Sequence, residues 1–263
     1  MRNIFFILFF ILSGSAFSQG KYSLIKTIEI QSDFFTTDNQ GSVYAVKTSE
    51  LSKYDNKGNL LYKYSNKILG NITFVDASNM LKILVFYKDF LQVVFLDNTL
   101  SANGETVSFD KIGFQQAQFV CSSHNSCMWI YDQQNFSLVR LDKNLEKIQQ
   151  TDNLNVLLND TIQLSGILEY DNKVYLNNPK TGILIFDVYG TYYKTIPVKN
   201  TTEFQPIGEW IYYKTDKKVK CYNIKTTEEK EFEMPLTDFK NFRLEMGVLM
   251  LRNNGSISLF AAE

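Results

Sequence analysis

One short pattern returns six times along this chain of 263 residues and constrains the fold more than any other feature. Its clearest copy has a strand-like run at 42–47, a second run at 51–54 that leads into Asp55–Gly58, and a third run at 60–64. The residue that directly follows the second run stands at positions 55, 97, 142, 187, 223 and 261, in steps of 42, 45, 45, 36 and 38. Such steps are typical of the four-stranded blades of a β-propeller.

The strand before each second run also keeps a nearly constant distance from it, which indicates a fixed hairpin. The offsets are 12, 11, 11 and 11 residues for the pairs Trp129 and Leu141, Tyr175 and Phe186, Ile211 and Tyr222, and Leu249 and Phe260. The chain holds 21 Phe and 15 Tyr, and these residues favour strands. This pattern disfavours a helical fold, and only 153–159 is expected to hold a helical turn.

We therefore predict an all-β fold, a single β-propeller of six four-stranded blades. The last copy ends at the chain terminus without a fourth strand, whereas the strand-like run at 23–30 has no blade of its own. We expect this N-terminal strand to complete the last blade and close the ring, which would remove the open seam. Five or seven blades, or β-sandwiches built from hairpins, are the alternatives.

The N-terminus predicts export. A charged start at Arg2 precedes an apolar run at 4–12 and a small-residue stretch in which Ala16 and Ser18 fit a signal peptidase site. Nine residues span about 14 Å as a helix, short of the roughly 30 Å hydrocarbon core. We expect residues 1–18 to be a cleaved signal peptide and 19–263 to be the β-propeller domain, located in the periplasm and peripheral at the outer membrane.

The cysteines offer one disulfide candidate, formed by Cys121 and Cys127. An exported protein permits disulfides, and a hairpin would bring the ends of two strands together. With His124 the pair also reads as a three-ligand metal motif, but no second cluster supplies a fourth ligand. Cys221 lies within a strand-like run and is expected to be a buried apolar residue.

The sequence offers no convincing catalytic, cofactor-binding or metal-binding residue. His124 is the only histidine, which excludes a metal centre that needs two. Asp55, Asp97, Asp142 and Asp187 occupy equivalent places in the repeat, where turn chemistry explains them. Carboxylates are numerous, so a glycosidase-like pair stays open. The formal net charge of −1 gives no indication of nucleic-acid binding.

Two surface features stand out as candidates for contact with a partner. The basic stretch 214–220 is followed by the acidic stretch 228–233, which predicts charge pairing across two strands of an outer surface. Aromatic residues dominate binding hot spots, and several lie near turns or strand ends. The candidate partner contacts are Phe34, Phe35, Tyr192, Tyr193 and Trp210.

The turn and strand at 38–46 and the hairpin at 51–58 resemble those of secreted six-bladed propellers with NHL-like repeats. The signal sequence, the size and the Lys-, Asn-, Ile- and Phe-rich composition resemble exported propellers of gliding Bacteroidota-type bacteria. That resemblance implies a plug-like subunit that closes the periplasmic end of the type 9 secretion translocon. No residue role carries over, because the shared motifs are short.

We expect a non-catalytic protein that binds a protein partner in an outer-membrane assembly and does not itself span the membrane. One alternative is a lactonase-like or sugar-acting propeller enzyme, or a ligand-binding protein, that uses the central channel. Such a protein would need inward-facing carboxylates or a Ca²⁺ site at one end of the axis. Another alternative is a surface adhesion module.

Overall fold

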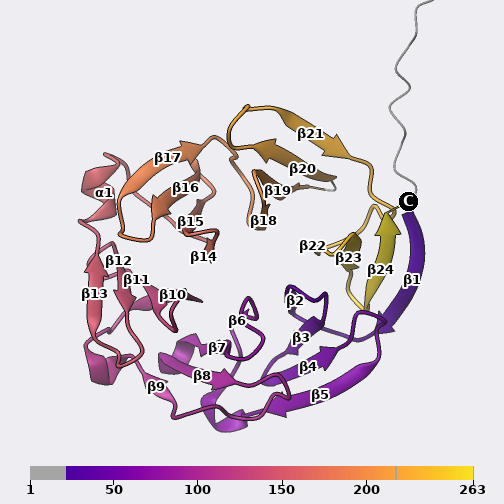
Figure 1. Cartoon of the computed structure of the whole chain (residues 1–263), viewed down its shortest axis with the longest axis horizontal. Coiled ribbons are helices and arrows are strands. Elements are labelled where there is room, and N and C mark those ends of the chain that lie inside the picture. The colour runs from indigo at the N-terminus through magenta and orange to yellow at the C-terminus, as the bar shows by residue number, and fades with distance from the viewer. Residues whose placement is uncertain (1–21, 217, 263) are drawn as a thin grey trace, which may run out of the picture.

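The chain forms a closed ring of six blades around a central opening (Figure 1). The computed structural model describes residues 22–216 and 218–262, and within them the strands form six four-stranded antiparallel sheets. In each of the first five blades the strands follow one another in sequence from the centre to the rim. The predicted β-propeller and its six blades are confirmed, whereas the predicted signal peptide lies outside the described residues.

The blades use the strands as follows. The first blade holds β2 (Phe34–Thr37), β3 (Val43–Lys47), β4 (Glu50–Tyr54) and β5 (Leu60–Ser65), and the second holds β6 (Phe74–Asp76), β7 (Ile83–Tyr87), β8 (Gln92–Leu96) and β9 (Val107–Ser108). The third holds β10 (Ala117–Ser122), β11 (Met128–Asp132), β12 (Ser137–Leu141) and β13 (Lys147–Gln150), and the fourth holds β14 (Gly166–Tyr170), β15 (Lys173–Asn178), β16 (Gly182–Asp187) and β17 (Tyr192–Ile196). The fifth holds β18 (Phe204–Ile207), β19 (Trp210–Thr215), β20 (Lys218–Asn223) and β21 (Glu229–Phe232). The sixth holds β22 (Asn241–Glu245), β23 (Val248–Arg252), β24 (Ser256–Ala262) and β1 (Tyr22–Glu29).

The N-terminal strand closes the ring, as predicted. β1 pairs antiparallel with β24, with Tyr22 opposite Ala262 and Glu29 opposite Ser256. It therefore becomes the outermost strand of a blade whose other three strands come from the end of the chain. Its Ile28 is buried beside the first blade, so this strand also joins the packing between the sixth blade and the first.

The repeated aspartates fix the turn between the third and fourth strands. In each turn the Asp Oδ1 accepts the backbone N–H groups two and four residues further on. The four residues are Asp55, Asp97, Asp142 and Asp187. An aspartate that satisfies two backbone donors in this way stabilises a tight turn. The structural interpretation of these carboxylates is confirmed.

The hydrophobic core consists of six clusters, each located between neighbouring blades. For example, Trp129 of the third blade and Phe186 of the fourth are fully buried in one cluster. Tyr44 of the first blade and Tyr87 of the second share another. Sheets that pack face to face in this way bury both faces, which explains the nearly continuous apolar runs of the middle strands.

Among residues 22–216 and 218–262, helical structure is limited to short connections. The turn α1 (Leu154–Leu157) lies in the expected segment, and its N-cap Asn153 accepts the backbone N–H groups of Asn155 and Val156. Three single 3-10 turns occupy Lys67–Leu69, Lys88–Phe90 and Asp110–Ile112. No helix among the described residues is long and apolar enough to cross a membrane.

Four of the outermost strands carry a β-bulge at the same place in the repeat. The register shifts by one residue opposite the two residues that precede positions 55, 142, 187 and 261, in the first, third, fourth and sixth blades. The extra residues, here called the bulge residues, are Leu61, Ile148, Tyr193 and Ile25. All four are large and apolar, and between 43% and 66% of each is exposed.

The outermost strand of the fifth blade, β21, carries charged residues instead of a bulge. β21 pairs regularly with β20, and the ion pairs Lys218–Glu231 and Lys220–Glu229 cross between the two strands. This confirms the predicted charge pairing between the basic and acidic stretches. Alternating charges on an edge strand oppose the addition of another strand, and so do bulges.

Candidate functional site

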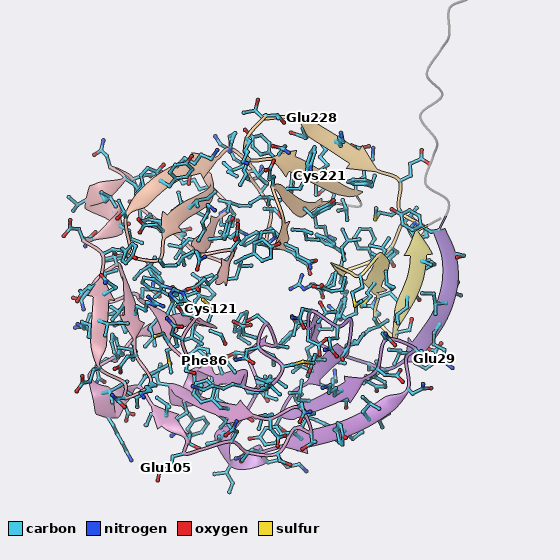
Figure 2. All side chains as sticks on the ribbon, in the orientation of Figure 1. Glu29, Phe86, Glu105, Cys121, Cys221 and Glu228 are labelled. Carbon is cyan, nitrogen blue, oxygen red and sulfur yellow. The ribbon has the colours of Figure 1, made fainter. Side chains whose placement is uncertain are left out.

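The candidate site lies where the central opening meets one face of the ring. In a four-stranded meander the turn after the first strand and the turn after the third lie at the same end of the sheet. We call this end of the ring the turn face. Residues that end the first strand, or follow it, in five blades line a hollow of about 460 Å³ there, and we call it the channel hollow. Figure 2 shows side chains extending from the innermost strands into the central opening.

The wall of the channel hollow is partly apolar. It is formed by side chains from the innermost strands of the second, fourth and fifth blades. These are Phe74, Val75, Leu168, Pro206 and Ile207. A concave apolar wall with a few polar groups is the usual composition of a ligand site.

The polar groups of the hollow include two carboxylates that accept only from neutral donors. Asp76 accepts the backbone N–H groups of Ser78 and Ser122, at 2.9 and 2.8 Å. Glu245 accepts from the hydroxyl of Thr37 at 3.2 Å and from the amide of Gln205 at 2.8 Å. Burial raises the pKa of Glu245.

The one arginine that lines the hollow is already paired. Arg243 donates to Glu203 across 3.1 Å, and both side chains are largely buried. Glu203 also accepts the backbone N–H of Phe242. Burial raises the pKa of Glu203 to about 7, against the opposing effect of Arg243. The charge of Arg243 thus acts on Glu203, and it also lowers the pKa of Glu245.

A buried polar network adjoins the hollow and joins the third and fourth blades. Glu169 of β14 accepts from Ser123 Oγ at 2.6 Å, Trp129 Nε1 at 2.7 Å and His124 Nδ1 at 2.9 Å. Burial alone would raise the pKa of Glu169, but these hydrogen bonds outweigh it and lower that pKa. We call these residues, together with Arg140, the Glu169 network.

Both ring nitrogens of His124 are engaged in this network. Arg140 Nη2 lies 2.8 Å from Nε2 and 3.1 Å from Nδ1, while Glu169 faces Nδ1. Because a guanidinium can only donate, the arrangement fits a ring that donates from Nδ1 and accepts at Nε2. A general base needs a free nitrogen within reach of a substrate proton, so His124 is poorly placed for that role.

A smaller hollow of about 180 Å³ lies beside His124 and also contacts Lys82 and Cys127. The ammonium of Lys82 lies 4.3 Å from the centre of the Phe95 ring. Burial lowers the pKa of Lys82. This pocket shares Ser78 and Glu169 with the channel hollow, so the two open beside each other on the turn face.

The structure does not join the two cysteines that the sequence suggested as a disulfide. Cys121, Cys127 and Cys221 are all free thiols. The hairpin register gives the reason, because Cys121 lies opposite Trp129 whereas Cys127 lies opposite Ser123. The two thiols are therefore displaced along the strands instead of facing each other, as a disulfide requires. Figure 2 places Cys121 in the third blade and Cys221 in the fifth.

The five aromatic residues predicted as partner contacts differ in their exposure. Tyr193 is 66% exposed, whereas Trp210 is half-buried beneath the ammonium of Lys230, 4.7 Å from the ring centre. Tyr192 packs edge-on against the core residue Phe186, and Phe34 packs partly against the core between the first and second blades. Phe35 is buried, which corrects its assignment to the surface: it lies between the first and sixth blades.

The sequence did not reveal the groups that form the site. Asp76, Glu169 and Glu245 lie at or near the ends of the first strands of their blades. The pattern that repeats in the sequence does not include these strands. One available signal was Arg140, a charged residue within the apolar run 138–141. A charge in such a place needs buried partners, which here are Ser123 and His124.

The ring and its inter-blade packing define the chain as a six-bladed β-propeller. Solved structures share this fold. The Neurospora crassa Pan2 WD40 domain matches with a TM-score of 0.66 and 9% identity over 93% of this chain and 96% of that one. A streptogramin B lyase matches with a TM-score of 0.62 and 11% identity, over 90% of this chain and 98% of that one. BamB from Moraxella catarrhalis matches with a TM-score of 0.60 and 11% identity, over 92% of this chain and 98% of that one.

No protein-family model and no curated protein sequence matches the chain. The solved structures include a lyase, a WD40 domain and BamB, so one fold serves an enzyme as well as other proteins. At these identities the similarity establishes the fold alone.

Proposed function

We propose that this chain is a non-catalytic, exported β-propeller that binds a protein partner as a subunit of an outer-membrane assembly. Its specific form would be a plug-like subunit of a type 9 protein-secretion channel, as the sequence resemblance implies. The proposal places the protein in the periplasm, peripheral at the outer membrane. The predicted signal peptide at 1–18 supports export, and the rigid ring supports a role as a binding scaffold.

The observation that carries the proposal is a group of exposed apolar side chains at the seam where the ring closes. They lie on β1 and β5, the outermost strands of the sixth and first blades, which follow one another around the rim (Figure 1). A Cβ on Gly58, just before β5, would lie 2.8 Å from the Lys26 side chain of β1, so the two strands are close. The residues of this seam patch are Leu24, Ile25, Leu60, Leu61 and Tyr62.

Each residue of the seam patch is between 42% and 59% exposed. Single exposed apolar residues are ordinary, but a group on the outermost strands of two neighbouring blades favours a protein-binding surface. Ile25 and Leu61 are bulge residues, so a regular strand cannot extend the sheet past them. The partner would therefore contact side chains of the seam patch instead of adding a strand.

The same structure gives little support to an enzyme. The four repeated aspartates hold turns, and His124 is engaged at both ring nitrogens. In the channel hollow, Asp76 and Glu245 accept hydrogen bonds from neutral donors, an arrangement that would suit the binding of a ligand. A lactonase-like or sugar-acting enzyme would need an acid or base free to reach a substrate proton.

Affinity purification tests the proposal. The full chain with a C-terminal tag would be purified from detergent-solubilised membranes, and an outer-membrane protein should co-purify. Leu24→Ser with Leu60→Ser should reduce its recovery. Ile148→Ser, a bulge residue on the third blade, should retain it and serves as the matched control. Recovery of no outer-membrane protein with the wild-type chain would overturn the proposal.

A further inference from the structure

The channel hollow holds more negative than positive charge among the described residues that line it. Asp76, Glu169 and Glu245 line it together with Arg243. No lysine or arginine of the described chain forms an ion pair with Asp76 or Glu245, and Arg243 pairs with Glu203. Arg243 is thus already held in an ion pair with Glu203, although its charge also lowers the pKa of Glu245. Neither Asp76 nor Glu245 has an ion-pair partner among the described residues.

The surroundings of Glu245 make this arrangement costly for the protein alone. Burial raises the pKa of Glu245, and the hydrogen bond from Thr37 and the charge of Arg243 offset this only in part. A carboxylate held away from water without a cation loses solvation that its two neutral hydrogen bonds only partly replace. A cation placed between Asp76 and Glu245 would restore that interaction, because charges attract more strongly in a partly desolvated site.

The shape of the hollow restricts the kind of cation. Its wall includes Phe74, Leu168 and Ile207, from three different blades, so a bare metal ion would leave this apolar surface uncovered. A volume of about 460 Å³ lies in the range of small-molecule sites. An aliphatic stem that ends in a charged tip would cover the apolar wall and still reach the carboxylates.

We propose that the channel hollow binds a guanidinium or ammonium group carried on an aliphatic stem. Asp76 of the second blade and Glu245 of the sixth accept the cation, and the apolar wall packs on the stem. The group could come from a free amine or from an arginine or lysine side chain that a protein presents. This binding site shares no residue with the seam patch, so its test is separate from the test of the proposed function.

Titration with a pair of matched small molecules tests the site. N-acetyl-arginine amide would be added to the isotope-labelled mature chain and followed by amide chemical shifts. Its neutral isostere, N-acetyl-citrulline amide, provides the comparison. We expect saturable shifts in β6, β14, β18 and β22 with arginine and none with citrulline. Equal effects of both compounds, or arginine shifts confined to other strands, would overturn the proposal.

Two double variants separate local recognition from general charge. Asp76→Asn with Glu245→Gln should weaken arginine binding by roughly tenfold or more, about the effect of losing one good charged contact. Asp171→Asn with Glu146→Gln removes the same charge from exposed positions outside the hollow and should leave binding unchanged. Unchanged amide shifts in the remaining blades would show that both variants fold. Equal binding by both variants would refute the assignment.

A peptide identifies the source of the cation. A single arginine would be placed in the middle of a short Gly-Ser peptide and titrated in the same way. Binding of the peptide as well as the free amide would indicate a protein-borne side chain as a ligand. Binding of the free amide alone would indicate a small amine. Failure of both to bind would reject the site. Because membranes are not needed, this result is separate from the co-purification experiment.

Discussion

Trp129 of the third blade donates its indole N–H to Glu169 of the fourth blade across 2.7 Å, and the whole tryptophan side chain is buried. The same carboxylate accepts from Ser123 and from His124. One residue thus satisfies several buried donors at the boundary between two blades, where the apolar cluster around Phe186 supplies the packing.

Replacing Glu169 should therefore destabilise the ring. Glu169→Ala would leave the Trp129 indole and the Ser123 hydroxyl without their acceptor, at a cost of about 3 kcal/mol in the free energy of unfolding. Urea unfolding followed by tryptophan fluorescence measures the change. Glu146→Ala, at an exposed position, should remain within about 0.5 kcal/mol of wild type. Equal effects of the two substitutions would contradict the role of the network.

Two neighbouring tyrosines should differ sharply in their contribution to stability. Tyr192 packs edge-on against Phe186 with ring centres 5.5 Å apart, whereas the bulge residue Tyr193 is 66% exposed. Tyr192→Ala should cost about 2–3 kcal/mol because it removes a packed ring. Tyr193→Ala should change the free energy of unfolding by less than about 0.5 kcal/mol. Denaturant titration of both variants tests the bulge, since a regular strand would reverse the order.

Glu203 should give the stability a pH dependence. Its folded pKa of about 7 lies above the ordinary value of 4.5, so between these values the folded chain holds a proton that the unfolded chain has released. Stability contributed by this group is fully present below pH 4.5 and is lost as the pH rises towards 7. The loss would reach about 3 kcal/mol.

The variant Glu203→Gln should lack this loss. Denaturation would be measured for both chains on either side of the window, and the difference in their pH slopes isolates Glu203. Parallel slopes for wild type and variant would show that the burial of Glu203 does not control its proton.

The free thiols should react at different rates in the folded protein. Cys121 is fully buried, and burial raises its pKa well above the ordinary value; burial also raises the pKa of Cys221 to about 11. Cys127 is only partly buried beside the pocket that contains Lys82. Because the thiolate is the reactive form, an alkylating agent should modify Cys127 first. Mass spectrometry of unreduced peptides would locate the label, and a disulfide-linked Cys121–Cys127 peptide would contradict the structure.

The repeat predicted the fold well because the strands of a blade are joined by hairpins, so residues that pair lie close together in the sequence. Ile211 lies directly opposite Tyr222, and Leu249 lies opposite Phe260, at the offset of 11 residues seen in the sequence. Asp55 and its equivalents mark turns through contacts within four residues. The closing role of β1 followed from counting strands, although its partner β24 lies at the other end of the chain.

The site was not predictable in the same way, because its contacts span blades. Glu169 meets His124 across 45 residues, and no periodicity records such a pair. Phe35 resembles a residue at a strand end, yet the neighbouring sixth blade covers it. A disulfide between Cys121 and Cys127 would require the two residues to lie opposite each other, and their spacing alone does not fix the register of the hairpin. In the observed register the residue opposite Cys121 is Trp129, two positions beyond Cys127.

The pairing of β1 with β24 also sets an order of events during folding. β1, the first strand of the described residues, finds its partner only in β24, the last one. Contacts so distant in sequence form late, after the five internal blades have had the opportunity to assemble. Until then β1 and β24 lack each other as partners, so the newborn chain passes through an open-ring stage in which both strands are unpaired edges that a folding helper could cover.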